Sequence, residues 1–134
     1  MSDVDLSAEE FEKYREAGAI LAEVLEAAAE RVEVGASHLE VAEFAEELTL
    51  ERGGEWAFPA NISVNEEASH ATPGRDDETV FEEGDLVCLD IGVHVDGWIA
   101  DAAVTVDLGD NTELVEAAEE ALEAAIDVVE PGAH

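Results

Sequence analysis

Two aspartates, Asp90 and Asp101, lie eleven residues apart on either side of an Asp96-Gly97 pair. An Asp-Gly pair between runs rich in Val, Ile and Leu is the strongest short-range signal for a two-residue β-hairpin with a type I′ turn. This turn sets Asp90 opposite Ala103, two residues from Asp101. Because residues two apart on a strand share a face, the carboxylates are predicted to be diagonal neighbours, with Cβ atoms about 7 Å apart.

Two carboxylates this close repel each other unless a cation lies between them, and divalent metals favour such oxygen ligands. Both aspartates interrupt apolar stretches, where acids are depleted and where a buried charge must be paired or bind a metal. The alternative is that both are simply solvated, because 36 of the 134 residues are acidic and chance pairs are common. The pattern favours a divalent metal site.

Composition excludes several classes of partner. Only 5 Lys and Arg residues oppose the 36 acids, giving a formal charge of −31. Nucleic acid is an implausible partner because a phosphate binder needs a cationic surface, and an anionic membrane surface is excluded for the same reason. The hydrophobic fraction of 47 % is too high for a disordered acidic tail. We therefore expect a folded protein of a halophile-like source, adapted to a high-salt cytoplasm.

Length and cysteine content indicate one cytoplasmic domain, residues 1–134. A chain of this length can bury about two-thirds of its unfolded surface. Cys88 is the only cysteine, so no intramolecular disulfide is expected, consistent with a reducing compartment. The acidic N-terminus lacks the apolar core of a signal peptide, and no apolar run approaches the roughly 20 residues that span a bilayer.

Helices are predicted to surround the hairpin. The capping-box pattern Ser7-Ala-Glu-Glu10 opens a helix over about 8–31. A second helix, capped by Ser37, is expected to end near residues 52–54. A third is expected over about 112–129. Its apolar residues are predicted to face inward: Leu114, Ala118, Ala121, Leu122, Ala125 and Ile126.

Few strands remain. The hairpin is predicted over 86–95 and 98–107, and a short third strand near 60–65, within an extended and irregular segment. The fold class is therefore α+β, with helices packed on a small antiparallel sheet. A single hairpin with one short strand is a small sheet, so the architecture looks incomplete.

Three segments read together resemble the amino-terminal half of a methionine aminopeptidase of type II, the archaeal and eukaryotic kind. They are Ala57–Pro73, Gly84–Gly92 and Asp96–Val106. The spaced aspartate pair alone is shared with proline dipeptidases. The Asn-Ile-Ser-Val-Asn and His-Ala-Thr-Pro stretches within the first segment favour the methionine enzyme.

This resemblance implies a fold and a site. The family fold is the pita-bread α+β architecture, two similar halves around a curved antiparallel sheet with two divalent metal ions (cobalt, manganese, iron or zinc). By position, Asp90 would bind one metal, Asp101 would bridge both, and His70 would contact the substrate and assist catalysis. Phe58 would form a wall of the methionine pocket. The family's other ligands, one histidine and two glutamates, belong to its second half.

The implied reaction is hydrolysis of the bond after the initiator methionine, with nascent peptide N-termini as substrates. A chain with two of five ligands is expected to be an incomplete, largely inactive fragment, and the full-length protein is expected to be a monomer. The rivals are a proline dipeptidase-like relative, a non-catalytic pita-bread binding module and a free-standing acidic domain whose acids only serve solubility.

Three further residues could be read as ligands. His94 and Cys88 share the predicted face of Asp90, but a hydrogen-bonded sheet histidine and a small buried cysteine are the favoured interpretations. His38 lies beside a helix cap and is expected to be structural.

The charge generates a first prediction. In dilute buffer the 134-residue chain should lose structure through self-repulsion, whereas in molar salt the Debye length falls to about 3 Å and screens most of it. Circular dichroism recorded from molar salt down to dilute buffer measures this. A spectrum that stays unchanged over that range would contradict it.

Overall fold

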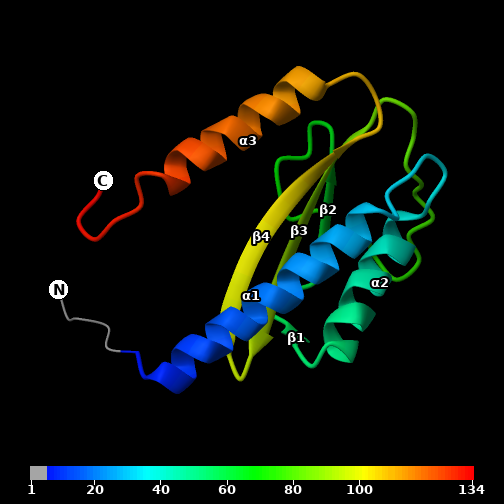
Figure 1. The fold of residues 1–134 in the computed structure, drawn as a ribbon. Helices are drawn as coiled ribbons and strands as arrows, with labels where there is room; N and C mark the ends of the chain where they lie inside the picture. Colours follow the sequence, from blue (N-terminus) through cyan, green and yellow to red (C-terminus); the bar gives the residue numbers. More distant parts are fainter. Residues whose placement is uncertain (1–5) are drawn as a thin grey trace.

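The computed structural model describes residues 6–134 as three helices and four strands (Figure 1). The order along the chain is α1 (Ala8–Ala29), α2 (His38–Glu51), β1 (Glu55–Trp56), β2 (Asn61–Val64), β3 (Leu86–Val95), β4 (Trp98–Asp107) and α3 (Thr112–Ile126). Helices α1 and α2 pack on one small antiparallel sheet, so the α+β prediction is confirmed.

The hairpin of β3 and β4 has the predicted bounds and the predicted register. Asp90 pairs with Ala103, and Gly92 pairs with Asp101. Asp96 and Gly97 both have positive φ angles, 50° and 86°, as a type I′ turn requires. The two carboxylates therefore belong to the same face of the sheet.

The other edge of β3 carries β1 and β2 in succession. Trp56 pairs with Val93 and Asn61 with Asp90, so four residues (57–60) lie opposite only two residues of β3 (91 and 92). A bulge of this kind lifts the chain off the strand and re-aims its side chains. The sequence predicted only an extended, irregular segment here, because a bulge has no periodic signature.

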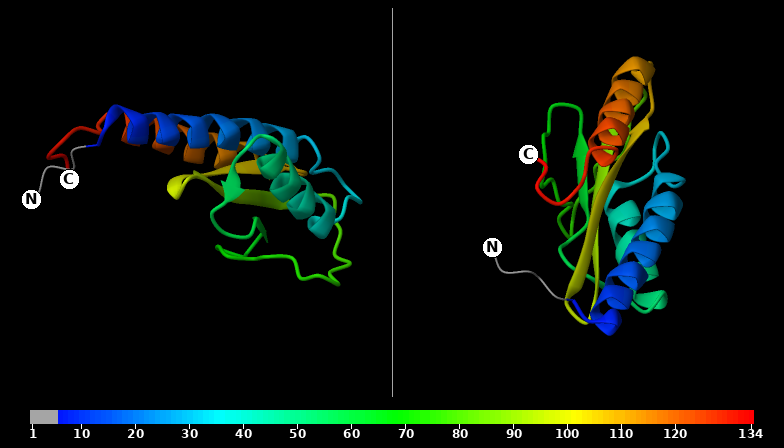
Figure 2. Two further views of the ribbon diagram at one scale, coloured as in Figure 1. Left: turned by 90° about the horizontal axis from the view of Figure 1, so that it is seen from below. Right: turned by 60° about the vertical axis from the view of Figure 1, so that its left-hand side comes forward.

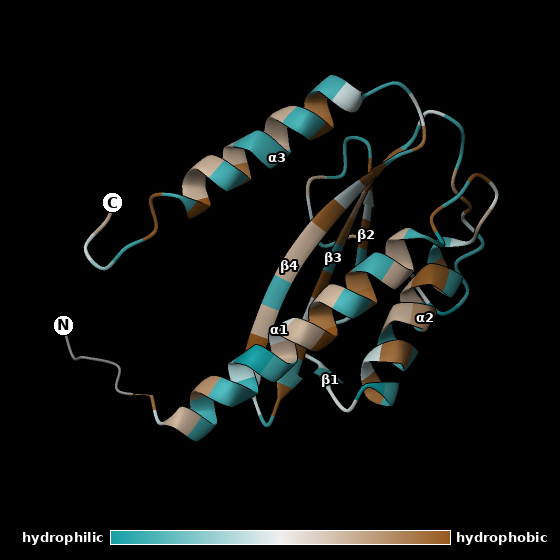
Figure 3. Cartoon of the chain, viewed as in Figure 1, coloured by the Kyte–Doolittle hydropathy of each residue, from teal (hydrophilic) through white to brown (hydrophobic). Residues whose placement is uncertain are grey.

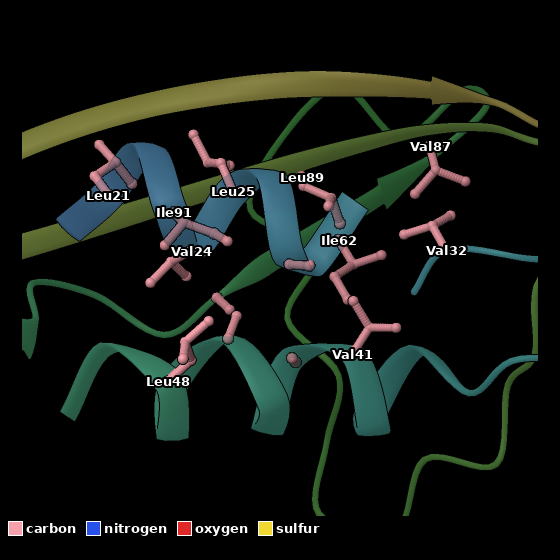
Figure 4. Close-up of a cluster of buried hydrophobic side chains, with 14 of the residues drawn as sticks. Leu21, Val24, Leu25, Val32, Val41, Leu48, Ile62, Val87, Leu89 and Ile91 are labelled. Carbon is pink, nitrogen blue, oxygen red and sulfur yellow. The ribbon is translucent and has the colours of Figure 1, made fainter. Parts of the chain in front are cut away.

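Alternate residues of β3 build the hydrophobic core. Val87, Leu89, Ile91 and Val93 are buried, and the side chains of Leu21, Val24 and Leu25 from α1 meet those of Leu48 and Val41 from α2 beside them (Figure 4). Brown segments recur along the helices in Figure 3, with hydrophilic residues between them. The intervening residues of β3 (88, 90, 92 and 94) belong to the opposite face.

The amino-terminal half of α1 holds the tip of the hairpin. The capping box is confirmed: the Glu10 amide donates to Ser7 Oγ, and the Ser7 amide donates to the Glu10 carboxylate at 2.8 Å. Lys13 Nζ lies 3.0 Å from a carboxylate oxygen of Asp96, and the ring of Tyr14 packs edge-on against Trp98. These contacts tie the turn to the helix.

The prediction that the apolar residues of α3 face inward is wrong for the described chain. Leu114, Leu122 and Ile126 are 64 %, 58 % and 55 % exposed, and no residue of α3 is buried. The helix also ends at Ile126 rather than near Val129. Its main packing partner among the described residues is β4, and it stands apart from α1 and α2 in Figure 1. A single strand cannot cover the apolar stripe.

Within residues 6–134, no helix combines the length and apolar character needed to cross a bilayer. The expectation about a signal peptide concerns the start of the chain, where residues 1–5 lie outside the described part.

A matched pair of glycine substitutions tests the turn. Gly97→Ala should destabilise the fold by about 1–2 kcal/mol, because a Cβ is strained at positive φ. Gly18→Ala in α1 should stabilise it by about 0.5–1 kcal/mol, because an added Cβ meets nothing within 4 Å and alanine favours helix. Chemical denaturation in molar salt measures both. Equal stability of Gly97→Ala and the wild type would argue against the I′ turn.

Candidate metal centre and substrate pocket

A hollow of about 470 Å³ is lined by residues of β2, β3 and β4, of the bulge before β2 and of the loop after it. It brings together the four residues that the sequence singled out, together with two that it did not. The lining residues are Phe58, Pro59, Asn61, His70, Asp90 and Asp101. In the left view of Figure 2, α1 and α3 lie above the sheet, and the chain between β2 and β3 passes below it.

Asp90 and Asp101 are close enough to affect each other's ionisation. Burial raises the pKa of the Asp90 carboxyl, and the charge of Asp101 and a hydrogen bond between the two groups raise it further, while nearby His70 acts in the opposite sense. Two carboxylates in this position need a proton or a cation between them, and among residues 6–134 no Lys or Arg lines the hollow. The donor set therefore fits a divalent cation.

Asp101 is exposed, although the apolar residues around it in the sequence suggested burial. It pairs with Gly92 across the hairpin. Across the described residues, no group of three or more His, Cys, Asp or Glu side chains is placed to hold a metal ion. The chain thus presents two carboxylates of a site and not a full coordination sphere.

His70 lies on the loop that returns from β2, as the sequence predicted. Its φ of 60° is in the left-handed region, and the following residues fasten it to β2. The Ile62 amide donates to the Ala71 carbonyl at 2.7 Å, and Thr72 Oγ1 donates to Asn61 Oδ1 at 2.7 Å. These two bonds hold the exposed imidazole near Asp90.

Sequence reasoning gave no role to Asn61 or Pro59. Asn61 is buried and pairs directly with Asp90 across the strands, so its side chain belongs to the site face. The proximity of Asn61 to Asp90 depends on how β2 is aligned with β3. That alignment depends on the bulge before β2, which the sequence did not predict. Phe58 and Pro59 reach the hollow because the same bulge carries them.

Three further residues had been interpreted as structural, and the structure shows the surroundings of each. His94 Nδ1 accepts a hydrogen bond from the Gly97 amide at 3.1 Å and so closes the turn. Cys88 is half-buried, and burial together with the charge of Asp90 raises the pKa of its thiol, which disfavours the metal-binding thiolate. His38 packs against the ring of Phe81. None of the three lines the hollow.

Two adjacent carboxylates on one face of a sheet, with an imidazole beside them, form an arrangement typical of metal-dependent hydrolases. Comparison with known proteins gives the family. The sequence model of metallopeptidase family M24 matches residues 12–134, and the chain belongs to that family.

Relatives within the family are methionine aminopeptidases of archaea. The chain is 60 % identical over 121 residues to that of Archaeoglobus fulgidus and 52 % identical over 122 residues to that of Pyrococcus horikoshii. Each alignment covers 90 % of the chain but only 42 % and 41 % of the relative. The chain therefore spans about two-fifths of the length of these proteins.

Solved structures agree. The crystal structure of methionine aminopeptidase from Thermotoga maritima superposes with a TM-score of 0.86 at 31 % identity, covering 93 % of the chain and 54 % of that structure. An X-Pro aminopeptidase from the same organism gives 0.66 at 23 % identity over 76 % of the chain and 29 % of that structure, which shows the fold alone. The predicted pita-bread half is confirmed.

Proposed function

We propose that this chain is the amino-terminal part of a type II methionine aminopeptidase that acts in the cytoplasm on nascent peptide N-termini. The observation that carries the proposal is the convergence of two carboxylates, an imidazole and an aromatic wall on one hollow. The 60 % identity to an archaeal methionine aminopeptidase supports the substrate class.

Asp90 and Asp101 would hold two divalent ions (cobalt, manganese, iron or zinc) together with ligands from elsewhere in the protein. A bound metal of this kind supplies a water molecule whose pKa falls to about 7. His70 would donate a hydrogen bond to the oxygen of the scissile carbonyl, where negative charge develops. Phe58 would bury the methionine side chain, a contact of about 1.5–3 kcal/mol if burial is complete.

The remaining ligands, one histidine and two glutamates, would come from polypeptide outside these 134 residues. Two observations support this. Asp101 is exposed although it would hold metal, and the apolar stripe of α3 is uncovered. Further polypeptide packed against β4 and α3 would cover both and complete a monomer.

The rivals have weaker support. A proline dipeptidase-like relative shares the fold, but the similarity to X-Pro aminopeptidase is 23 % in sequence. A non-catalytic binding module has no need of both carboxylates, yet both are present and interact. A purely solvating role for the acids does not account for the pocket around them. The charge of −31 supports a high-salt environment without nucleic-acid or membrane partners.

Metal binding tests the pair directly. Asp101→Asn should weaken binding of manganese or cobalt at least tenfold, because a neutral amide neither balances nor bridges the cation. The matched control is Asp110→Asn, which removes the same charge at an exposed position in the loop before α3. Isothermal titration on the 134-residue chain in molar salt measures both. Equal affinities for the two variants would indicate solvating acids.

Hydrolysis tests the assignment as a whole. The 134-residue chain with manganese should turn over methionyl peptides little or not at all, since an open two-carboxylate site cannot hold two cations tightly. The chain extended by its downstream coding sequence should hydrolyse them and should favour a small second residue. Full turnover by the 134-residue chain would overturn the incomplete-site proposal, and preference for an X-Pro bond would favour the prolidase relative.

A further inference from the structure

Gly92 lies beneath the ring of Phe58. A Cβ added to Gly92 would stand 2.2 Å from Cε1 of that ring and 2.7 and 2.8 Å from Cδ1 and Cζ. Its backbone does not need glycine, because Gly92 is in mid-strand and is not among the residues with positive φ. The requirement at this position is therefore steric: the ring occupies the space that a side chain would fill.

The same glycine stands at the centre of the site. It lies two residues from Asp90 on the same face of β3 and pairs with Asp101 across the hairpin. Its carbonyl accepts a hydrogen bond from the Ala57 amide at 2.8 Å. The backbone of Gly92 thus binds the first residue of the bulge, and the absence of a side chain leaves space for the Phe58 ring.

A steric clash at position 92 would be relieved by movement of the Phe58 ring. The clashing atoms belong to the end of a side chain and not to backbone, so a methyl group at position 92 would displace the ring before it broke the strand. Phe58 is only half-buried and lines the hollow, which gives the ring room to move. The change would alter the pocket wall more than the fold.

We propose that Gly92 is a positioning residue for substrate binding. Because it has no side chain, the ring of Phe58 packs directly on β3 and forms the apolar wall beside the carboxylate pair. This rests on the proposed function for the identity of the bound side chain, a methionine at the peptide N-terminus. Gly92 touches neither the substrate nor the metal in this role and acts through Phe58.

A double-mutant cycle in the extended, active protein tests the proposal. Gly92→Ala should raise KM for a methionyl peptide about tenfold, the size expected when one apolar contact is lost, with kcat within about threefold. Manganese affinity should stay within twofold of the wild type. Phe58→Ala should raise KM similarly, and Gly92→Ala should add nothing in that background, because two residues acting through one contact are not additive.

Gly18→Ala is the control for a glycine-to-alanine change that meets no neighbour, and it should leave KM unchanged. An unchanged KM in Gly92→Ala, or an effect that adds fully to that of Phe58→Ala, would overturn the proposal. Loss of manganese binding in Gly92→Ala would also overturn it, since the glycine would then be shaping the metal ligands.

A second measurement separates this inference from the proposed function. In nuclear magnetic resonance spectra of the 134-residue chain, the Gly92 α-protons should show a ring-current shift that disappears in Phe58→Ala. If the extended wild-type protein hydrolysed no methionyl peptide, the proposed function would be wrong, and the ring-current shift would still decide whether the Phe58 ring packs on Gly92. If the Gly92 α-protons showed no ring-current shift, the proposed packing of Phe58 on Gly92 would be wrong, even in an active enzyme.

Discussion

The pairing register of the β3–β4 hairpin is the constraint on which the site depends. Because side chains alternate between the faces of a strand, a slip of one residue would send Asp90 and Gly92 to the helix side and Leu89 and Ile91 to the pocket side. The two positive φ angles of Asp96 and Gly97 fix the length of the turn and hence the register. The contacts of Lys13 and Tyr14 with the hairpin tip reinforce it.

Period-two alternation separates stability from chemistry along a single strand. The odd-numbered residues of β3 from Val87 to Val93 are buried against α1 and α2, and the even-numbered Asp90 and Gly92 shape the pocket. The packing of the odd-numbered side chains in the core therefore holds the strand rigidly and fixes the even-numbered residues at the pocket. Residues held on strands keep a more precise geometry than residues on loops, which suits metal ligands. The loop-borne His70 needs the additional bonds of Ala71 and Thr72 to β2.

Local signals in the sequence were sufficient for the hairpin, for the N-caps Ser7 of α1 and Ser37 of α2, and for the placement of the two aspartates on one face. Each of these depends on residues close together in the chain. The bulge at residues 57–60 was missed because it arises from two pairings with a third strand, Trp56 with Val93 and Asn61 with Asp90. Periodicity correctly gave α3 an apolar stripe, but a stripe does not reveal whether a partner is present to cover it. The roles of His70 and Phe58 came from resemblance, since neither residue type has a distinctive spacing.

The acidity of the whole chain and the pair of carboxylates act on different scales. A net charge of −31 attracts cations of every kind from a distance, but in molar salt that field decays within about 3 Å. Long-range attraction therefore cannot select a divalent ion from an excess of monovalent ones. Selection must come from ligands in direct contact, where two carboxylates share one cation and screening is weak. Asp90 and Asp101 are of the same residue type as many surface acids, and only the hairpin register makes this pair a candidate metal site.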